Sequence, residues 1–176
     1  TITNVPTGTQ SLGPNGEVLR YQISVAQNRL TIWNNTAIPE ALGGTTGSNA
    51  WMWRPYNKTL DGRRGYSMNV SIAGTLPTGS SIVLALDDRL ICRSDYTHFA
   101  ISLKQGEVGR IMWTRLLSEL PNNVTIIWER PMMANVESGV FIVGVQEELM
   151  WYGFDINSGT YLWRAGSGLS WDYFQN

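Results

Sequence analysis

The side chains that most often perform chemistry are scarce in this chain of 176 residues. It contains one cysteine, Cys92, and one histidine, His98. A zinc site needs several His or Cys ligands, and a catalytic triad needs a histidine beside a nucleophile and an acid. Cys92 lies in an apolar run, so we expect a buried small hydrophobe rather than a nucleophile. The sequence therefore predicts no metal site, no intrachain disulfide and no catalytic residue of these types.

Paired carboxylates are the other candidates for acid–base chemistry. Asp87 and Asp88 separate two apolar runs, and Glu147 and Glu148 occupy the corresponding place before the last pair of apolar runs. Neighbouring residues on a strand point to opposite faces, so neither pair forms a natural two-carboxylate site. We interpret both pairs as turn-forming and solubilising residues, and we expect no enzyme activity and no cofactor.

Charge excludes two classes of partner. The formal net charge is −1, only 15% of residues are charged, and no run of Lys and Arg occurs. Nucleic-acid binding depends on clustered positive charge, so we expect no such partner. No apolar stretch approaches the roughly 18 residues that cross a bilayer. The first residue is Thr1, so we expect that a signal peptide or a larger N-terminal region has been removed.

The elements that must position any site are strands joined by tight turns. Residues 150–164 alternate in polarity around Asn157-Ser158-Gly159, which predicts a hairpin. Weaker copies of this unit occupy residues 99–113 and 21–33, and each copy ends in a tryptophan. Trp33 and Trp113 are 80 residues apart, and Trp113 and Trp163 are 50 apart. One structural module has therefore been repeated, with a degenerate copy in the longer interval.

Periods of about 40 to 50 residues with four strands each are typical of β-propeller blades. We predict an all-β fold: a β-propeller-like array of about four four-stranded antiparallel blades in a single domain, residues 1–176. This array would be a half-propeller or a fragment of one. The alternative is a β-sandwich in which the tryptophan spacing is accidental. The expected repeats are 13–36, 50–74, 80–115 and 123–165, followed by a terminal cap at 166–176.

The last repeat resembles a known motif. The string from Gly153 to Trp163 is similar to the Ala-x-Asp-x-x-Thr-Gly-x-x-x-Trp repeat of PQQ-type β-propellers, with Asp155, Gly159 and Trp163 matching outright. The resemblance implies that the tryptophan of one blade packs near a peptide plane of the next. The upstream copies keep Trp113 and Trp33 but have Ser102 and Ser24 in place of the aspartate. The wider pattern also resembles repeat proteins that are common in archaeal genomes.

PQQ-dependent alcohol dehydrogenases of this family have eight blades, a quinone and a calcium ion on the propeller axis, and a disulfide between neighbouring cysteines. This chain has one cysteine and about half of the blades. No quinone, calcium or catalytic-base position can be assigned. A role as a fragment of a PQQ-linked oxidoreductase is therefore the least favoured interpretation. A fold shared with a family does not by itself establish a function.

An open array of blades leaves strand edges and end faces uncovered. Two chains could close one ring, the chain could be a piece of a longer protein, or edges could join chains into a filament. The segment from Thr1 to Thr9 could add a strand to another sheet or chain. These three arrangements remain open at the level of the sequence.

We predict a secreted or cell-surface, non-enzymatic module for binding or assembly, whose partner is a second copy, another protein or a glycan. The alternative is a self-assembling extracellular structural subunit. Aromatic rings anchor interfaces and stack on sugars; the candidates are Trp51, Trp53, Tyr56, Trp151, Trp171, Tyr173 and Phe174. Four Asn-x-Ser/Thr sequons are candidates for N-glycosylation, at Asn34, Asn57, Asn69 and Asn123.

Overall fold

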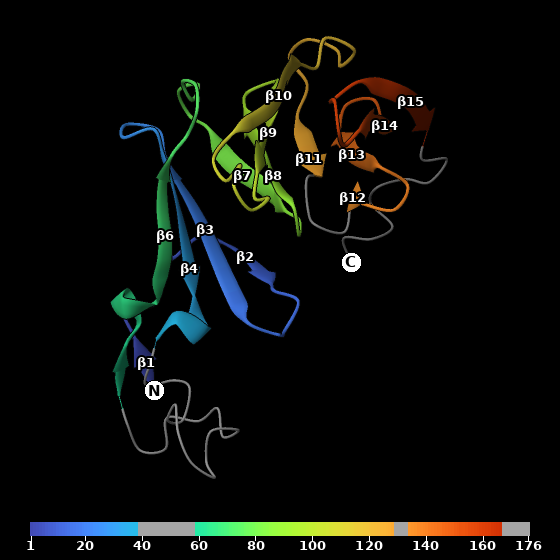
Figure 1. Ribbon diagram of the computed structural model, residues 1–176. Coiled ribbons are helices and arrows are strands. Elements are labelled where there is room, and N and C mark those ends of the chain that lie inside the picture. Colours follow the sequence, from blue (N-terminus) through green and yellow to red (C-terminus); the bar gives the residue numbers. More distant parts are fainter. Residues whose placement is uncertain (39–58, 129–133, 167–176) are drawn as a thin grey trace. The chain divides into compact units, whose positions relative to one another are not determined.

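The computed structural model describes residues 1–38, 59–128 and 134–166 (Figure 1). The chain divides into two compact units, Thr1–Leu76 and Pro77–Asn176. Apart from two short 3₁₀ turns, every regular element in the described part is a β-strand. The all-β fold class predicted from alternation and turn residues is confirmed.

The first unit is built on the antiparallel sheet β2-β3-β4-β6. The bounds of these strands are β2, Thr9–Leu12; β3, Val18–Ser24; β4, Arg29–Asn34; and β6, Tyr66–Ser71. A short parallel pair joins β1 (Ile2–Thr3) to β5 (Leu60–Asp61). The 3₁₀ turns η1 (Asn35–Ala37) and η3 (Gly62–Gly65) follow β4 and β5.

One asparagine organises the turn between β3 and β4. Asn28 has a φ of 51°, a left-handed conformation that asparagine tolerates better than most residues. Its amide group donates to the carbonyl oxygens of Ile72 and Gly74, and its Oδ1 accepts the N–H of Leu76 at 3.1 Å. This side chain therefore fixes the end of the first unit onto its own β3–β4 turn.

Trp33 has a different place from the one expected. It lies in β4, the third strand of its sheet, whereas Trp113 and Trp163 lie in the fourth strands of theirs. Its indole Nε1 donates to the carbonyl oxygen of Gly62 at 2.5 Å, and the ring packs directly on Gly65. Trp33 therefore stabilises its own unit, and the hairpin at 21–33 is the second and third strands rather than a copy of the last hairpin.

The second unit contains two sheets. The first has the order β10-β9-β8-β7, with β7 at Ser81–Ala85, β8 at Arg89–Ser94, β9 at Thr97–Ser102 and β10 at Ile111–Leu116. The second has the order β11-β13-β14-β15, with β11 at Ile126–Trp128, β13 at Val140–Val145, β14 at Met150–Asp155 and β15 at Tyr161–Gly166. The short strand β12 (Ala134–Asn135) pairs with β13.

The described residues therefore form three antiparallel sheets with four-stranded paths, where about four blades were expected. The difference arises at β6. Because Tyr66–Ser71 pairs with β4, it completes the first sheet and does not begin a sheet of its own. Residues 39–58, which include the first part of the expected second repeat (50–58), lie outside the described residues.

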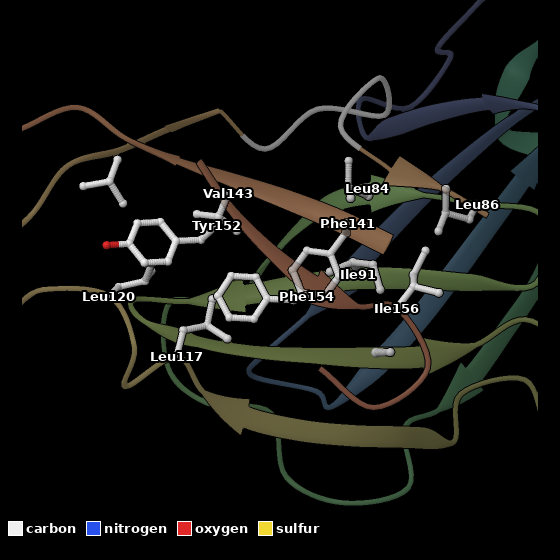
Figure 2. Close-up of a cluster of buried hydrophobic side chains, with 12 residues drawn as sticks. Leu84, Leu86, Ile91, Leu117, Leu120, Phe141, Val143, Tyr152, Phe154 and Ile156 are labelled. Atoms are coloured by element: carbon white, nitrogen blue, oxygen red, sulfur yellow. The ribbon is translucent and has the colours of Figure 1, made fainter. Parts of the chain in front are cut away.

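The two sheets of the second unit share one apolar core (Figure 2). Alternate residues of β7, β8 and β9 meet alternate residues of β13 and β14, as period-2 patterning requires. Phe141 and Phe154 stack with ring centroids 5.4 Å apart, and Trp113 stacks on Phe141 at 6.0 Å. The fully or almost fully buried members are Leu84, Ile91, Ala100, Leu117, Phe141, Val143, Val145, Tyr152, Phe154 and Ile156.

Candidate interaction surface

The turn between β14 and β15 is built by the motif that the sequence singled out. Asp155 Oδ1 accepts the N–H groups of Asn157 and Ser158, both at 2.8 Å, and the Ser158 hydroxyl at 2.9 Å. The N–H of Gly159 donates to the carbonyl oxygen of Asp155 at 2.8 Å. Gly159 has a φ of 70°, which glycine adopts without strain. The aspartate thus supplies the acceptors that this short loop needs.

The neighbouring sheet closes its corresponding turn with the same backbone pattern. Gly109 donates its N–H to the Ser102 carbonyl oxygen at 3.0 Å, and the Ser102 N–H donates to the Arg110 carbonyl oxygen at 2.8 Å. In the last sheet the equivalent bonds run from Gly159 to Asp155 and from Asp155 to Thr160. Ser102 therefore stands where Asp155 stands, although its loop is longer and its hydroxyl accepts the N–H of Lys104 instead.

Trp113 carries the contact between the two sheets of the second unit. Its indole Nε1 donates to the carbonyl oxygen of Ile156 at 3.1 Å, and its ring lies against Gly159. A Cβ atom added to Gly159 would lie 2.8 Å from the Trp113 ring, closer than real Cβ atoms approach. The glycine therefore serves two purposes: it provides the left-handed turn and it leaves room for the indole.

A buried arginine reinforces this contact. Arg89 donates from Nη1 to the same Ile156 carbonyl oxygen at 3.0 Å and to Asn157 Oδ1 at 2.8 Å. Asp88 accepts from the Arg89 guanidinium at 2.7 Å through both carboxylate oxygens, which lowers the pKa of Asp88 and raises that of Arg89. We call the set of Arg89, Trp113, Ile156 and Gly159 the inter-sheet joint.

Trp163 occupies the place in β15 that Trp113 occupies in β10. In the strand register Trp113 pairs with Ala100, and Trp163 pairs with Gly153. The Trp163 ring covers Gly153 so closely that an added Cβ would lie 2.3 Å from it. Trp163 as a residue is nevertheless 38% exposed. The joint made by Trp113 thus has no equivalent at Trp163 within the described residues.

Trp163 belongs to the side of its sheet that faces away from the shared core. Cross-strand partners lie on one face and residues two apart on a strand share a face. Phe141, Tyr152 and Phe154 point into the core. The alternating residues therefore form the opposite side, which we call the front face; its members are Val140, Ile142, Gly144, Trp151, Gly153, Asp155, Trp163 and Ala165.

Three of the side chains considered for catalysis are buried or hydrogen-bonded to the backbone. Cys92 is completely buried, and burial raises the pKa of its thiol. His98 is also buried; its ring stacks on Phe141 at 6.2 Å, and its Nδ1 lies 3.4 Å from the Tyr96 carbonyl oxygen. Glu147 accepts the Thr125 N–H at 2.8 Å, which lowers the pKa of Glu147. Over residues 1–38, 59–128 and 134–166, no group of three or more His, Cys, Asp and Glu residues could hold a metal ion.

The asparagines of the sequons differ in their exposure and in the hydrogen bonds that their side chains make. Asn34 Oδ1 accepts the backbone N–H of Thr36 at 2.8 Å and its hydroxyl at 2.7 Å, and the residue is half-buried. Asn69 is exposed and its Oδ1 accepts from Arg29 Nε at 2.6 Å. Asn123 lies in an exposed turn with a φ of 60°. Asn57 lies outside the described residues.

Several aromatic candidates also lie outside the described residues: Trp51, Trp53, Tyr56, Trp171, Tyr173 and Phe174. Of the aromatic partner candidates, Trp151 is described, and it is half-buried on the front face. The sequence did not identify Arg89 as part of the joint, because a charged residue beside an acidic turn gives no sign of burial. None of the helical segments that the structure describes is long and apolar enough to cross a membrane.

Comparisons with known proteins give fold-level likeness and no family. No protein-family model and no curated protein matches the chain. Among solved structures, BamB from Moraxella catarrhalis is similar at 14% identity and a TM-score of 0.46, covering 94% of this chain and 39% of BamB. Hsv2p from Kluyveromyces lactis is similar at 10% identity and a TM-score of 0.49, covering 94% of this chain and 49% of Hsv2p. This chain thus spans less than half of either protein, and at these scores neither likeness assigns a function.

Proposed function

We propose that this chain is a non-enzymatic module for binding and assembly that acts outside the cell or at the cell surface. The observation that carries the proposal is the front face with Trp163 at its centre. The corresponding tryptophan one sheet earlier, which is half-buried, packs against the next sheet through Ile156 and Gly159. Trp163 places its indole over Gly153, and the residue is 38% exposed.

An exposed tryptophan on a rigid sheet is suited to recognition. Tryptophan is among the residues that most often dominate binding energy, because it buries a large area with few rotatable bonds. Gly153 beneath the ring holds the indole flat against β14. Such a side chain loses little conformational entropy when a partner covers it.

The extracellular part of the proposal has separate support. The chain is poor in charged residues, and two of its sequons, at Asn69 and Asn123, lie at exposed positions. If the protein passes through a glycosylating secretory route, its natural mass exceeds the polypeptide mass of 19.7 kDa. Asn69→Gln and Asn123→Gln should each remove one glycan. A natural mass equal to that of the polypeptide would leave glycosylation without support.

Site-specific photo-crosslinking tests the binding function. A photoreactive amino acid is placed at Ala165, on the front face, in the natural protein in its own cells. The expected result is a discrete crosslinked product that disappears when Trp163→Arg is added. Placement at Leu116, which is 60% exposed on β10, is the matched control. Absence of any Trp163-dependent product at Ala165 would overturn the proposal.

A further inference from the structure

The loop that joins β2 to β3 contains a tight turn with an asparagine at its centre. Gly16 donates its N–H to the Gly13 carbonyl oxygen at 3.0 Å, which closes a β-turn around Pro14 and Asn15. The Gly13 N–H donates to the Glu17 carbonyl oxygen at 2.8 Å. Gly16 has a φ of 80°, and no described atom beyond its chain neighbours lies within 4 Å of the position that a Cβ would take. Asn15 is therefore followed by a residue that has no side chain and an open surrounding.

The side chain of Asn15 is unrestrained. It is exposed, and within residues 1–38, 59–128 and 134–166 its amide has no hydrogen-bond partner. The backbone of the residue is held in place instead, because its N–H donates to Glu17 Oε2 at 2.9 Å. The amide carbon of Asn15 is thus free to turn toward the backbone nitrogen of Gly16.

We propose that Asn15 is a site of spontaneous deamidation, and that its conversion loosens β2 from the sheet of the first unit. The Gly16 nitrogen attacks Cγ of Asn15, the Cγ–Nδ2 bond breaks, and ammonia leaves with the proton from Gly16. The product is a cyclic imide. Water then adds to one of the two imide carbonyls and the C–N bond on that side breaks, which gives aspartate or isoaspartate. Water is the only co-reactant, and no oxidation or reduction occurs.

The residue that follows an asparagine decides how easily the nitrogen attacks. A Cβ on that residue crowds the approach, and a β-branched side chain crowds it most. Asparagine is a thermally labile residue type in general. In this sequence Asn15 is the one asparagine that precedes glycine. Selectivity for this position therefore follows from the sequence, and the structure adds that the position is exposed and its amide free.

Two other exposed asparagines provide internal comparisons. Asn123 precedes Val124, whose N–H donates to the Tyr96 hydroxyl at 2.9 Å. Asn157 precedes a serine, and its Oδ1 accepts from Arg89 at 2.8 Å. Asn123 therefore has exposure without a following glycine, and Asn157 has neither a free amide nor a following glycine.

Conversion would disturb the turn in two ways. A new carboxylate would lie beside Glu17, whose own carboxylate accepts the Asn15 N–H, and like charges repel. In isoaspartate the main chain also passes through the side-chain carbons, so the turn gains one backbone atom and the Gly16–Gly13 hydrogen bond no longer fits. β2 (Thr9–Leu12) is the outermost strand of its sheet and pairs with β3 (Figure 1). The loss of order is therefore expected in β2 first.

Mass spectrometry of the full chain tests the conversion. The chain and a peptide of residues 11–19 are incubated side by side at pH 7.4, and proteolytic fragments are followed over time. We expect the fragment with Asn15 to gain about 1 Da before any other, partly as isoaspartate. Attack requires the Gly16–Gly13 hydrogen bond to open, so the folded chain should react about fivefold more slowly than the peptide.

Two variants serve as matched controls for the conversion. Asn15→Gln should abolish it, because the longer side chain closes the ring poorly. Gly16→Ala should slow it, and the open space around Gly16 lets this variant fold. An Asn15 that stays intact after the peptide has converted overturns the proposal, as does earlier conversion at Asn123 or Asn157. Conversion without isoaspartate would overturn the cyclic route.

Hydrogen exchange of the converted chain tests the loosening. The amides of Thr9–Leu12 should exchange about fivefold faster or more, because the turn has lost a hydrogen bond of ordinary strength. The amides of β7 (Ser81–Ala85), an end strand in the second unit, should be unchanged. Asn15→Gln treated in the same way should show no change in either strand. Unaltered exchange at Thr9–Leu12 in a fully converted chain would overturn the effect on β2.

Discussion

Two tryptophans at equivalent positions of neighbouring sheets have opposite surroundings. Trp113 on β10 donates to the Ile156 carbonyl oxygen and packs on Gly159 of the next sheet. Trp163 on β15 packs on Gly153 of its own sheet and keeps 38% of its surface exposed. The same residue type therefore joins two sheets at one position and remains partly exposed at the other. The position of a tryptophan in its sheet therefore does not by itself fix its surroundings within the described residues.

The largest expected change in stability comes from removing the Trp113 indole, and removal of the Trp163 indole is its comparison. Trp113→Ala should lower the free energy of unfolding of the second unit by about 3 kcal/mol, because it leaves a cavity beside Phe141 and Gly159 and strips the Ile156 carbonyl of one donor. Trp163→Ala should cost about 1 kcal/mol or less. Urea unfolding followed by circular dichroism gives both values. Equal losses of unfolding free energy would contradict the claim that Trp113 supports the fold more than Trp163 does.

The glycine of the joint provides the next comparison. Gly159→Ala must place a Cβ at 2.8 Å from the Trp113 ring while keeping a φ of 70°. We expect a loss of about 2 to 3 kcal/mol. Gly106→Ala is the control, since Gly106 has a φ of 81° with nothing near its Cβ position, so about 1 kcal/mol is expected. The difference between the two melting temperatures isolates the contact with Trp113.

A substitution at Arg89 tests the contribution of hydrogen bonds to the inter-sheet joint. Arg89→Met keeps much of the aliphatic volume but removes the donors to Ile156 and Asn157. We expect a loss of about 2 kcal/mol, because Asp88 also loses its buried partner. A double variant with Trp113→Phe, which removes the indole donor and part of the ring, should show a non-additive loss. Additive losses would mean that the two donors act independently on the Ile156 carbonyl.

The smallest effect is a dependence on pH. The Arg89 guanidinium lowers the folded-state pKa of Asp88 below its unfolded value. The stability that this pair contributes is therefore complete above the ordinary aspartate pKa, near 4, and is lost as the pH falls below it. The difference in unfolding free energy between the wild type and Asp88→Asn should shrink between pH 5 and pH 3, and a constant difference would contradict this assignment.

Local sequence patterns were enough to predict the last hairpin and the residues that form its turn. Asp155, Gly159 and Trp163 have residue types that a short turn and a packed indole require, so their spacing identifies them. The same reasoning misplaced Trp33. A strand that ends in tryptophan has the same alternation whether it is the third or the fourth in its sheet, and only the pairing of β6 with β4 distinguishes the two.

The joint itself was only half predictable. The packing of a tryptophan near a peptide plane of the next blade was expected from the resemblance, but the contribution of Arg89 was not. The burial of Arg89 depends on the Ile156 carbonyl and on Asn157, which are 67 and 68 residues away in the chain. The exposure of Trp163 could not be predicted either, because it depends on what covers the front face rather than on any neighbour in the sequence.

The joint is directional, since one sheet supplies the indole and the guanidinium while the next supplies the turn. This asymmetry has an evolutionary consequence. Tandem duplication of the segment that encodes one sheet would copy both a turn and a tryptophan, so the copied sheet could form the same joint with its neighbours. Lineages could therefore lengthen or shorten such a protein by whole sheets without inventing a new contact between them.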